Sequence, residues 1–224
     1  MIIIYQTYFL GQKGKDIKMN YRKKVGIMGG TFNPIHLGHM LVAETAYETF
    51  DLDEILFVPS GIPYMKENVL DAKTRITMTG LAIEDNSHFA LSTIEVDRDG
   101  NSYSYETIRD LKASNPNVEY YFIVGADSLF AMDKWMCPEK IFHEVIVLVA
   151  RRPGHAEEEL NAKIEELKEK YDADIRTLPI NCVDISSTNI RDRVRNHQSI
   201  RYMVHQQVID YINKNHIYWS EDEK

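Results

Sequence analysis

Residues 29–40, GGTFNPIHLGHM, decide the fold class of this chain. They follow a short apolar run at residues 24–28 and precede residues 41–50, whose apolar side chains recur at helical spacing. A strand, a turn and a helix are therefore predicted in succession. Paired glycines let a backbone take positive φ and let a ligand approach closely, and the N-terminus of a helix attracts anions. The turn therefore predicts an anion-binding site.

Two histidines, His36 and His39, stand three positions apart at the start of the predicted helix, so they share one face of it. No GK[ST] follows, so this is not a Walker A loop, and the glycine spacing differs from that of the GxGxxG dinucleotide fingerprint. A metal ion would need further ligands, yet no carboxylate or third histidine lies close by in the sequence, and an HExxH pattern is absent. Phosphate is therefore the expected ligand of this pair.

Strand and helix patterns continue to alternate along the chain. Further strands are expected at residues 54–60, 89–96, 118–127, 144–150 and 174–180. Helices are expected at residues 37–50, 71–85, 104–114, 128–135, 157–170, 186–194 and 204–215, with Asp71 as an N-cap. This order predicts a single α/β domain with a doubly wound, mainly parallel sheet and right-handed crossovers. The turns after the strands should converge on one crevice at the carboxyl edge of the sheet.

Composition excludes several other classes of protein. A chain of 224 residues with 44% hydrophobic content can bury the core of one domain, and its net charge of -8 argues against nucleic-acid binding. The two cysteines, Cys137 and Cys182, are too few for a disulfide framework, so a reducing cytoplasm is expected. No segment is apolar enough to span a membrane, and the first residues lack the features of a signal peptide. We expect residues 1–18 to be an N-terminal extension outside a domain of residues 19–224.

The tetrapeptide HLGH at residues 36–39 resembles the (H/T)xGH signature of the nucleotidylyltransferase superfamily, which has a Rossmann-like fold. The longer form GGTFNPIHLGH is similar to that of bacterial nicotinate-nucleotide adenylyltransferases. Five further segments match that family in order: GNSYSYETI, IVGADSL with Trp135, ARRPG, ISSTNIRDRV and IRYMVHQQVIDYINKNHIY. The resemblance thus extends from Lys24 to Tyr218.

This resemblance implies transfer of the adenylyl group of ATP to nicotinate mononucleotide, giving deamido-NAD and pyrophosphate in NAD biosynthesis. ATP would carry a magnesium ion, with no metal site on the protein. The implied catalytic residues are His36, His39, Lys66 and Arg191. The implied ATP-binding residues are Gly29, Gly30, Thr31, Phe32, His36, His39, Asp127, Ser186, Ser187, Thr188 and Arg191. The implied mononucleotide-binding residues are Asn33, Lys66, Tyr103, Ser104, Asp127 and Trp135.

Several of these residues also have a purely structural explanation. Asp127 follows a predicted strand, where it suits either ribose hydroxyls or the N-cap of the next helix. Trp135 suits either a pyridine ring or the core. Ser187 and Thr188 are predicted N-caps, and with Arg191 one turn later they would form a polyphosphate cradle.

Other features leave alternatives open. Arg75 and Arg152 suit the crevice or a surface salt bridge equally. The chain departs from the family pattern at residues 64–66, where Tyr-Met-Lys replaces Pro-His-Lys, and at Ser104, where threonine is usual. Nicotinamide mononucleotide and phosphopantetheine are alternative acceptors, and a nucleotide-binding sensor without turnover is a third alternative. The sequence also leaves a homo-oligomer open.

Overall fold

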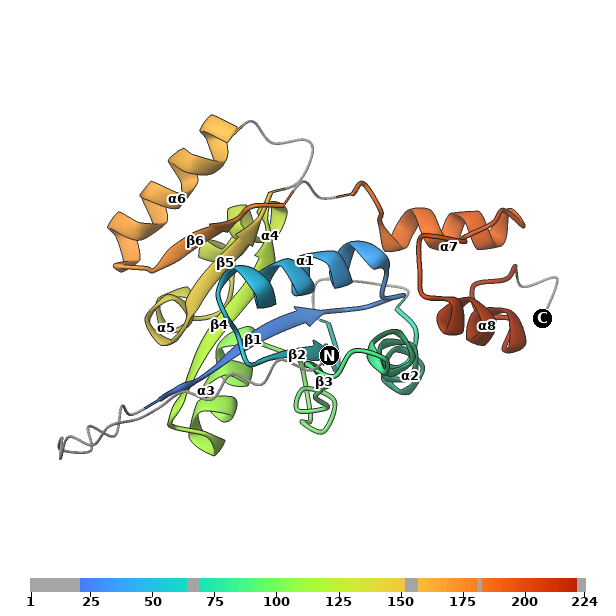
Figure 1. The fold of residues 1–224 in the computed structure, drawn as a ribbon, viewed down its shortest axis with the longest axis horizontal. Coiled ribbons are helices and arrows are strands. Elements are labelled where there is room, and N and C mark those ends of the chain that lie inside the picture. Colours follow the sequence, from blue (N-terminus) through green and yellow to red (C-terminus); the bar gives the residue numbers. More distant parts are fainter. Residues whose placement is uncertain (1–20, 64–68, 152–156, 181–182, 221–224) are drawn as a thin grey trace, which may run out of the picture.

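Six parallel strands form the central sheet, in the order β3-β2-β1-β4-β5-β6 (Figure 1). The computed structural model describes residues 21–63, 69–151, 157–180 and 183–220. The strands are β1 (Lys23–Gly30), β2 (Glu54–Pro59), β3 (Phe89–Leu91), β4 (Val118–Gly125), β5 (Ile146–Ala150) and β6 (Ile175–Leu178). The predicted doubly wound parallel sheet is therefore confirmed.

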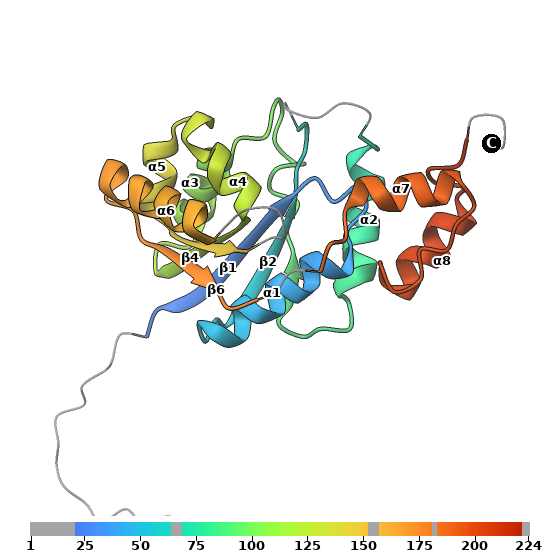
Figure 2. The ribbon, with the colours of Figure 1, turned by 90° about the horizontal axis from the view of Figure 1, so that it is seen from above.

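Helices connect the strands and cover both faces of the sheet (Figures 1 and 2). One face packs against α1 (Leu37–Thr49), α2 (Ala72–Ile83), α7 (Ser187–Arg195) and α8 (Gln206–Lys214). The other packs against α3 (Ser104–Ser114), α4 (Ala126–Ala131), α5 (Pro138–Glu144) and α6 (Glu157–Tyr171). In both views α7 and α8 lie beside α2, at the end of the molecule away from α5 and α6. Within the described segments, no helix combines the length and the apolar composition that crossing a membrane would take.

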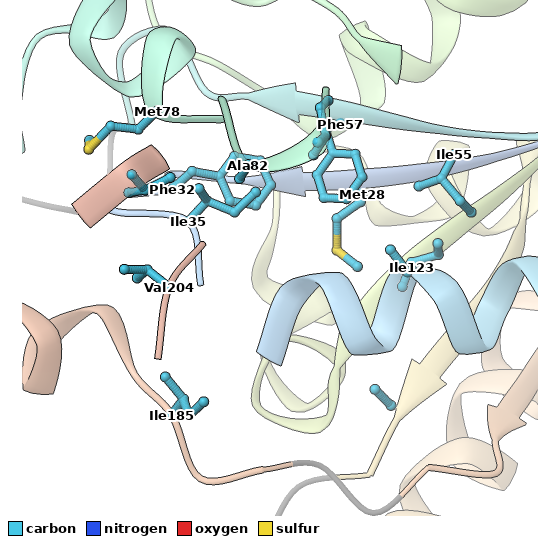
Figure 3. Packing of buried hydrophobic residues seen from close by; sticks show 14 of the residues in the cluster. Met28, Phe32, Ile35, Ile55, Phe57, Met78, Ala82, Ile123, Ile185 and Val204 are labelled. Carbon is cyan, nitrogen blue, oxygen red and sulfur yellow. The ribbon is translucent and has the colours of Figure 1, made fainter. Parts of the chain in front are cut away.

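Each strand directs alternate side chains to opposite faces of the sheet. Ile27 of β1 belongs to the core cluster on one face, and its neighbour Met28 belongs to the cluster on the other. Figure 3 shows the second cluster, in which Met28 lies with Phe57 of β2 and Ile123 of β4. Because both faces are covered, the central strands are apolar along almost their whole length.

The strand order reverses between β1 and β4. The chain runs from β1 outward to β3 on one side and then returns to β4 on the other side. Ligands of doubly wound sheets bind outside the carboxyl ends of the strands at such a reversal. The turn after β1 and the start of α4 after β4 both leave the sheet at this point.

Two local predictions differ from the structure. The strand expected at residues 89–96 ends at Leu91, because the backbone turns at Thr93, whose carbonyl accepts hydrogen bonds from the N–H groups of Val96 and Asp97. Helix α5 was not predicted, because its seven residues are too few for a helical period to show in the sequence.

Candidate active site

A cavity of about 860 Å³ lies at the carboxyl edge of β1 and β4. Its lining includes every predicted site residue in the described part of the chain: Gly29, Gly30, Thr31, Phe32, Asn33, His36, His39, Tyr103, Ser104, Asp127, Trp135, Ser186, Ser187, Thr188 and Arg191. Lys66 lies outside the described residues, as do Arg152 and the extension 1–18. The fold thus brings motifs from distant parts of the sequence around one space.

The turn after β1 owes its shape to Phe32 rather than to the paired glycines. The expectation of positive φ at Gly29 and Gly30 was wrong, because both end β1 and Phe32 is the left-handed residue of this turn, with φ 49°. The buried Phe32 ring lies against Gly30, where an added Cβ would come within 2.8 Å of it. Gly30 is therefore needed for this close approach of an aromatic ring.

The two histidines lie side by side at the start of α1, with stacked rings 3.7 Å apart between centroids. The backbone N–H of His36, the N-cap residue, donates a hydrogen bond of 3.3 Å to Nδ1 of His39. A backbone N–H can only donate, so Nδ1 of His39 is the acceptor and the neutral ring carries its proton on Nε2. The edge of Phe32 packs on the same ring with centroids 5.1 Å apart. His39 is thus oriented from two sides, and its Nε2 carries the ring proton.

Side chains from α7 hold the turn through its carbonyl groups. Arg191 donates a hydrogen bond of 2.9 Å to the carbonyl oxygen of Asn33, and the Ser187 hydroxyl donates one of 2.9 Å to that of Pro34. The N-cap of α7 is Ser186, whose hydroxyl oxygen accepts the N–H of Asn189. The prediction of Ser187 and Thr188 as N-caps was therefore wrong, because the helix begins one residue earlier.

Tyr218 adds a contact that the sequence pattern did not indicate. Its hydroxyl donates a hydrogen bond of 2.8 Å to Oδ1 of Asn33, and both residues are buried. Burial raises the pKa of the Tyr218 hydroxyl, so this group stays protonated and remains a donor. The turn is therefore bonded both to α7 and to the segment that follows α8.

Arg75 has a role that neither alternative anticipated. Arg75 is 1% exposed, and its guanidinium donates hydrogen bonds of 2.8 to 2.9 Å to the carbonyls of Leu70, Thr31 and Gly61. Arg75 is absent from the cavity lining and forms no surface salt bridge with any residue that the structure describes. Burial lowers the pKa of this guanidinium, and Asp71 nearby opposes the shift. Arg75 joins the turn after β1 to the loop after β2.

The end of β4 supplies the next part of the lining. Gly125 is the N-cap of α4, so Asp127 lies inside the first turn and the N-cap alternative for Asp127 was wrong. The helix expected at residues 128–135 is instead α4 followed by the 3-10 helix η1 (Met132–Lys134). Trp135 ends η1, lines the cavity and packs edge-on against Phe122 with centroids 6.3 Å apart. Trp135 is partly buried, so its side chain both packs against the core and presents indole surface to the cavity.

The start of α3 completes the cavity wall, with Tyr103 as N-cap and Ser104 as the first helical residue. Sequence reasoning missed Glu95, a buried carboxyl in the same wall. Burial raises the pKa of Glu95, while hydrogen bonds from Thr107 and Ser102 oppose that shift. Glu95 lay in the segment predicted as strand, so only its charge could have marked it.

Comparison with known proteins identifies the family. The cytidylyltransferase-like family model matches residues 27–193. A protein of Lachnoclostridium phytofermentans named "probable nicotinate-nucleotide adenylyltransferase" is 43% identical over 198 residues, covering 88% of this chain and 99% of the relative. A protein of the same name from Leifsonia xyli is 38% identical over 199 residues, covering 89% and 96% of the two chains.

Solved structures share the fold. The nicotinic acid mononucleotide adenylyltransferase of Plasmodium falciparum complexed with NaAD superposes with a TM-score of 0.73 at 23% identity, covering 88% of this chain and 97% of that one. At this identity the likeness concerns the fold. The family model covers most of the chain, and the bacterial relatives align over nearly their whole length. The chain therefore belongs to the cytidylyltransferase-like family and, within it, is an enzyme of the nicotinate-nucleotide adenylyltransferase group.

Proposed function

We propose that this enzyme joins nicotinate mononucleotide to the adenylyl group of ATP, releasing pyrophosphate, as a step of NAD biosynthesis. One observation carries the proposal: a single cavity is lined by the stacked pair His36 and His39 and by the start of α3 with Trp135. Imidazoles beside helix N-termini suit a triphosphate, and an exposed indole surface suits a pyridine ring. The names of the bacterial relatives support the same substrates.

In the proposed reaction, a 5′-phosphate oxygen of the mononucleotide attacks the α-phosphorus of ATP. The new P–O bond forms as the bond to the β-phosphate breaks, and pyrophosphate leaves with that electron pair. Both reactants are anions, so the enzyme must reduce their repulsion and hold them in line. Positioning and charge stabilisation therefore carry the rate, and no side-chain nucleophile is required.

We assign the phosphate contacts to the residues around the turn. The Nε2–H of His39 would donate to an α-phosphate oxygen and stabilise the charge that develops there. His36 would contact the adjoining phosphates, and Arg191 would bind them at the start of α7. Lys66 would reach the β- and γ-phosphates, a role that rests on its place in the family pattern.

Magnesium would enter bound to the phosphates of ATP and neutralise part of their charge. In the described part of the chain, no group of three or more His, Cys, Asp or Glu side chains is placed to hold a metal ion. That ATP carries the ion, with no metal site on the protein, stays a prediction from the family resemblance. The cytoplasmic location and a homo-oligomer remain predictions from the sequence.

The acceptor would occupy the part of the cavity lined by α3 and the end of β4. Trp135 would stack on the pyridine ring, Asp127 would accept hydrogen bonds from ribose hydroxyls, and Asn33 and Tyr103 would complete this subsite. The Ser104 hydroxyl and the first N–H groups of α3 would bind the nicotinate carboxylate. An amide would direct its own NH₂ at these donors, so the acid is favoured.

A direct assay tests the proposal. Purified protein is mixed with ATP, magnesium and, in turn, nicotinate mononucleotide, nicotinamide mononucleotide or phosphopantetheine, and pyrophosphate and adenylylated product are measured. We expect kcat/KM for the nicotinate acceptor to exceed that for the amide by about 10-fold or more, with no product from phosphopantetheine. A higher kcat/KM for either other acceptor would change the assigned substrate. Absence of product with all three would overturn the proposal.

A further inference from the structure

Glu95 is a buried carboxyl in the cavity wall to which the proposed reaction gives no role. The residue lies in the turn after β3, is 9% exposed, and lines the cavity together with Ser102, Ser104 and Thr107. Burying an acidic group costs free energy unless hydrogen bonds compensate. Its burial at this place therefore calls for an explanation.

Two hydroxyl groups interact with the Glu95 side chain. Thr107 donates a hydrogen bond of 2.7 Å from Oγ1 to Oε1 of Glu95, and the nearby Ser102 hydroxyl lowers the pKa of the same carboxyl. Ser102 precedes α3 and Thr107 lies in its first turns, so they flank Ser104, the first helical residue. One carboxyl thus ties together both sides of the segment that begins α3.

The surroundings leave this arrangement little freedom. A Cβ added at Gly61 would lie 2.3 Å from the carbonyl oxygen of Glu95, so the loops after β2 and β3 are in direct contact. The N–H of Gly61 donates a hydrogen bond of 2.9 Å to Oγ of Ser102. Arg98 donates one of 3.1 Å to Oγ1 of Thr107. The Thr107 hydroxyl is therefore held between Glu95 and Arg98, and the Ser102 hydroxyl is fixed by the N–H of Gly61.

We infer that Glu95 is a positioning residue that sets the preference for the acid acceptor, by holding Ser102 and Thr107 so that the start of α3 presents its donors to the carboxylate. This inference rests on the proposed function. Donors that are ordered before binding spare the acceptor the cost of ordering them. They also penalise an amide, whose NH₂ meets donors that have no freedom to turn away. Glu95 acts through the two hydroxyls rather than on the acceptor itself.

The substitution Glu95→Gln tests this role, because it keeps the shape and replaces one carboxylate oxygen with a donor. We expect kcat/KM for nicotinate mononucleotide to fall by about 10-fold or more, chiefly through KM, as one or two hydrogen bonds are lost. The acid-to-amide ratio of kcat/KM should fall, and the KM for ATP should stay within about 2-fold of the parent value. Thr107→Val should reproduce the effect, and Thr107→Ser, which keeps the hydroxyl, should not.

Asp97 provides the matched control. It lies in the same turn and accepts a hydroxyl hydrogen bond of 2.6 Å from Thr93, but it is exposed and lies outside the cavity lining. Asp97→Asn should therefore leave KM and the acid-to-amide ratio at parent values. An effect of Asp97→Asn as large as that of Glu95→Gln would overturn the inference.

The other possible outcomes of these measurements lead to different conclusions. A Glu95→Gln protein with lowered thermal stability but an unchanged acid-to-amide ratio would make the role structural only. A raised ratio would mean that the charge of Glu95 repels the acid, which also contradicts positioning. If Glu95→Gln does not fold, the acid-to-amide ratio of kcat/KM measured for Thr107→Val tests the inference instead. Failure of the parent enzyme to adenylylate any acceptor would refute the proposed function, whereas an active parent with unaltered variants would refute this inference alone.

Discussion

The imidazole of His36 lies against Gly38, the residue between the two histidines. A Cβ added at Gly38 would come within 3.0 Å of Nδ1 of His36. The same ring stacks on His39, so it has close neighbours on two sides. Gly38 does not have positive φ, and its glycine is explained by the position of this ring rather than by its own backbone conformation.

Gly38→Ala should therefore separate stability from activity. Alanine favours a helix over glycine by up to about 1 kcal/mol, so the free energy of unfolding should not fall. The displaced imidazole should lower kcat by about 10-fold or more. Gly80→Ala in α2 is the control, because the nearest atom to its new Cβ is Leu91 Cδ2 at 3.7 Å. It should keep kcat at the parent value, and urea unfolding with steady-state assays measures both variants.

His39→Ala should reduce turnover far more than ATP affinity. The Nε2–H of His39 is assigned to charge that develops during the reaction, and loss of such a donor costs about 100-fold in kcat. The dissociation constant for ATP, measured by calorimetry, should change by less than about 3-fold. His143→Ala, at an exposed position of α5, should change neither quantity. Equal losses of kcat and affinity in His39→Ala would limit its role to binding.

Replacement of Arg75 should destabilise the enzyme. Arg75→Met leaves three carbonyl groups without their donor, and each buried unsatisfied acceptor costs roughly 1 kcal/mol or more, so a loss of about 3 kcal/mol is expected. Arg75→Lys should restore only part of the lost stability, because a lysine ammonium cannot reach all three carbonyl groups as the branched guanidinium does. Denaturant unfolding measures the loss. Arg195→Lys on the surface should unfold at the parent midpoint, and the same result for Arg75→Met would disprove the bridging role.

The N-cap of α2 predicts a pH-dependent contribution to stability. The hydroxyl and the N–H of Thr74 both donate to Asp71 and lower the pKa of its carboxyl. The stabilisation is therefore present above the unfolded-state pKa of about 3.9 and is lost as pH falls through the lower folded-state value. Asp71→Ala should cost about 1 kcal/mol at neutral pH.

Unfolding experiments at two pH values test whether this stabilisation is lost as pH falls. The difference between Asp71→Ala and the parent should be full at neutral pH and should shrink as pH falls below about 3.9 and the parent carboxyl becomes protonated. Asp71→Asn keeps an N-cap that does not titrate, so its stability advantage over Asp71→Ala should not shrink in the same way. A difference between parent and Asp71→Ala that is constant with pH would contradict the assigned ionisation.

Part of the cavity lining could be predicted because its residues directly follow strands. The carboxyl ends of parallel strands share one edge of a sheet, so the turn with His36 and the segment with Asp127 had to meet there. Helical spacing likewise predicted that His36 and His39 lie on one face. Predictions for single residues were less accurate. The N-cap of α7 is Ser186 in place of Ser187, and the residue with positive φ in the turn after β1 is Phe32 rather than a glycine.

The sequence by itself determined the alternation of strands and helices, and with it the parallel sheet and the edge where the site lies, because hydrophobic periodicity is a local property of the chain. Only the tertiary structure decided which groups support that site. The Tyr218 hydroxyl reaches Asn33 across 185 positions, Arg75 joins the turn after β1 to the loop after β2, and the Glu95 carboxyl accepts a hydrogen bond from Thr107 near the start of α3. Such hydrogen bonds depend on the distance and direction between atoms that packing brings together, and spacing along one chain does not encode these quantities.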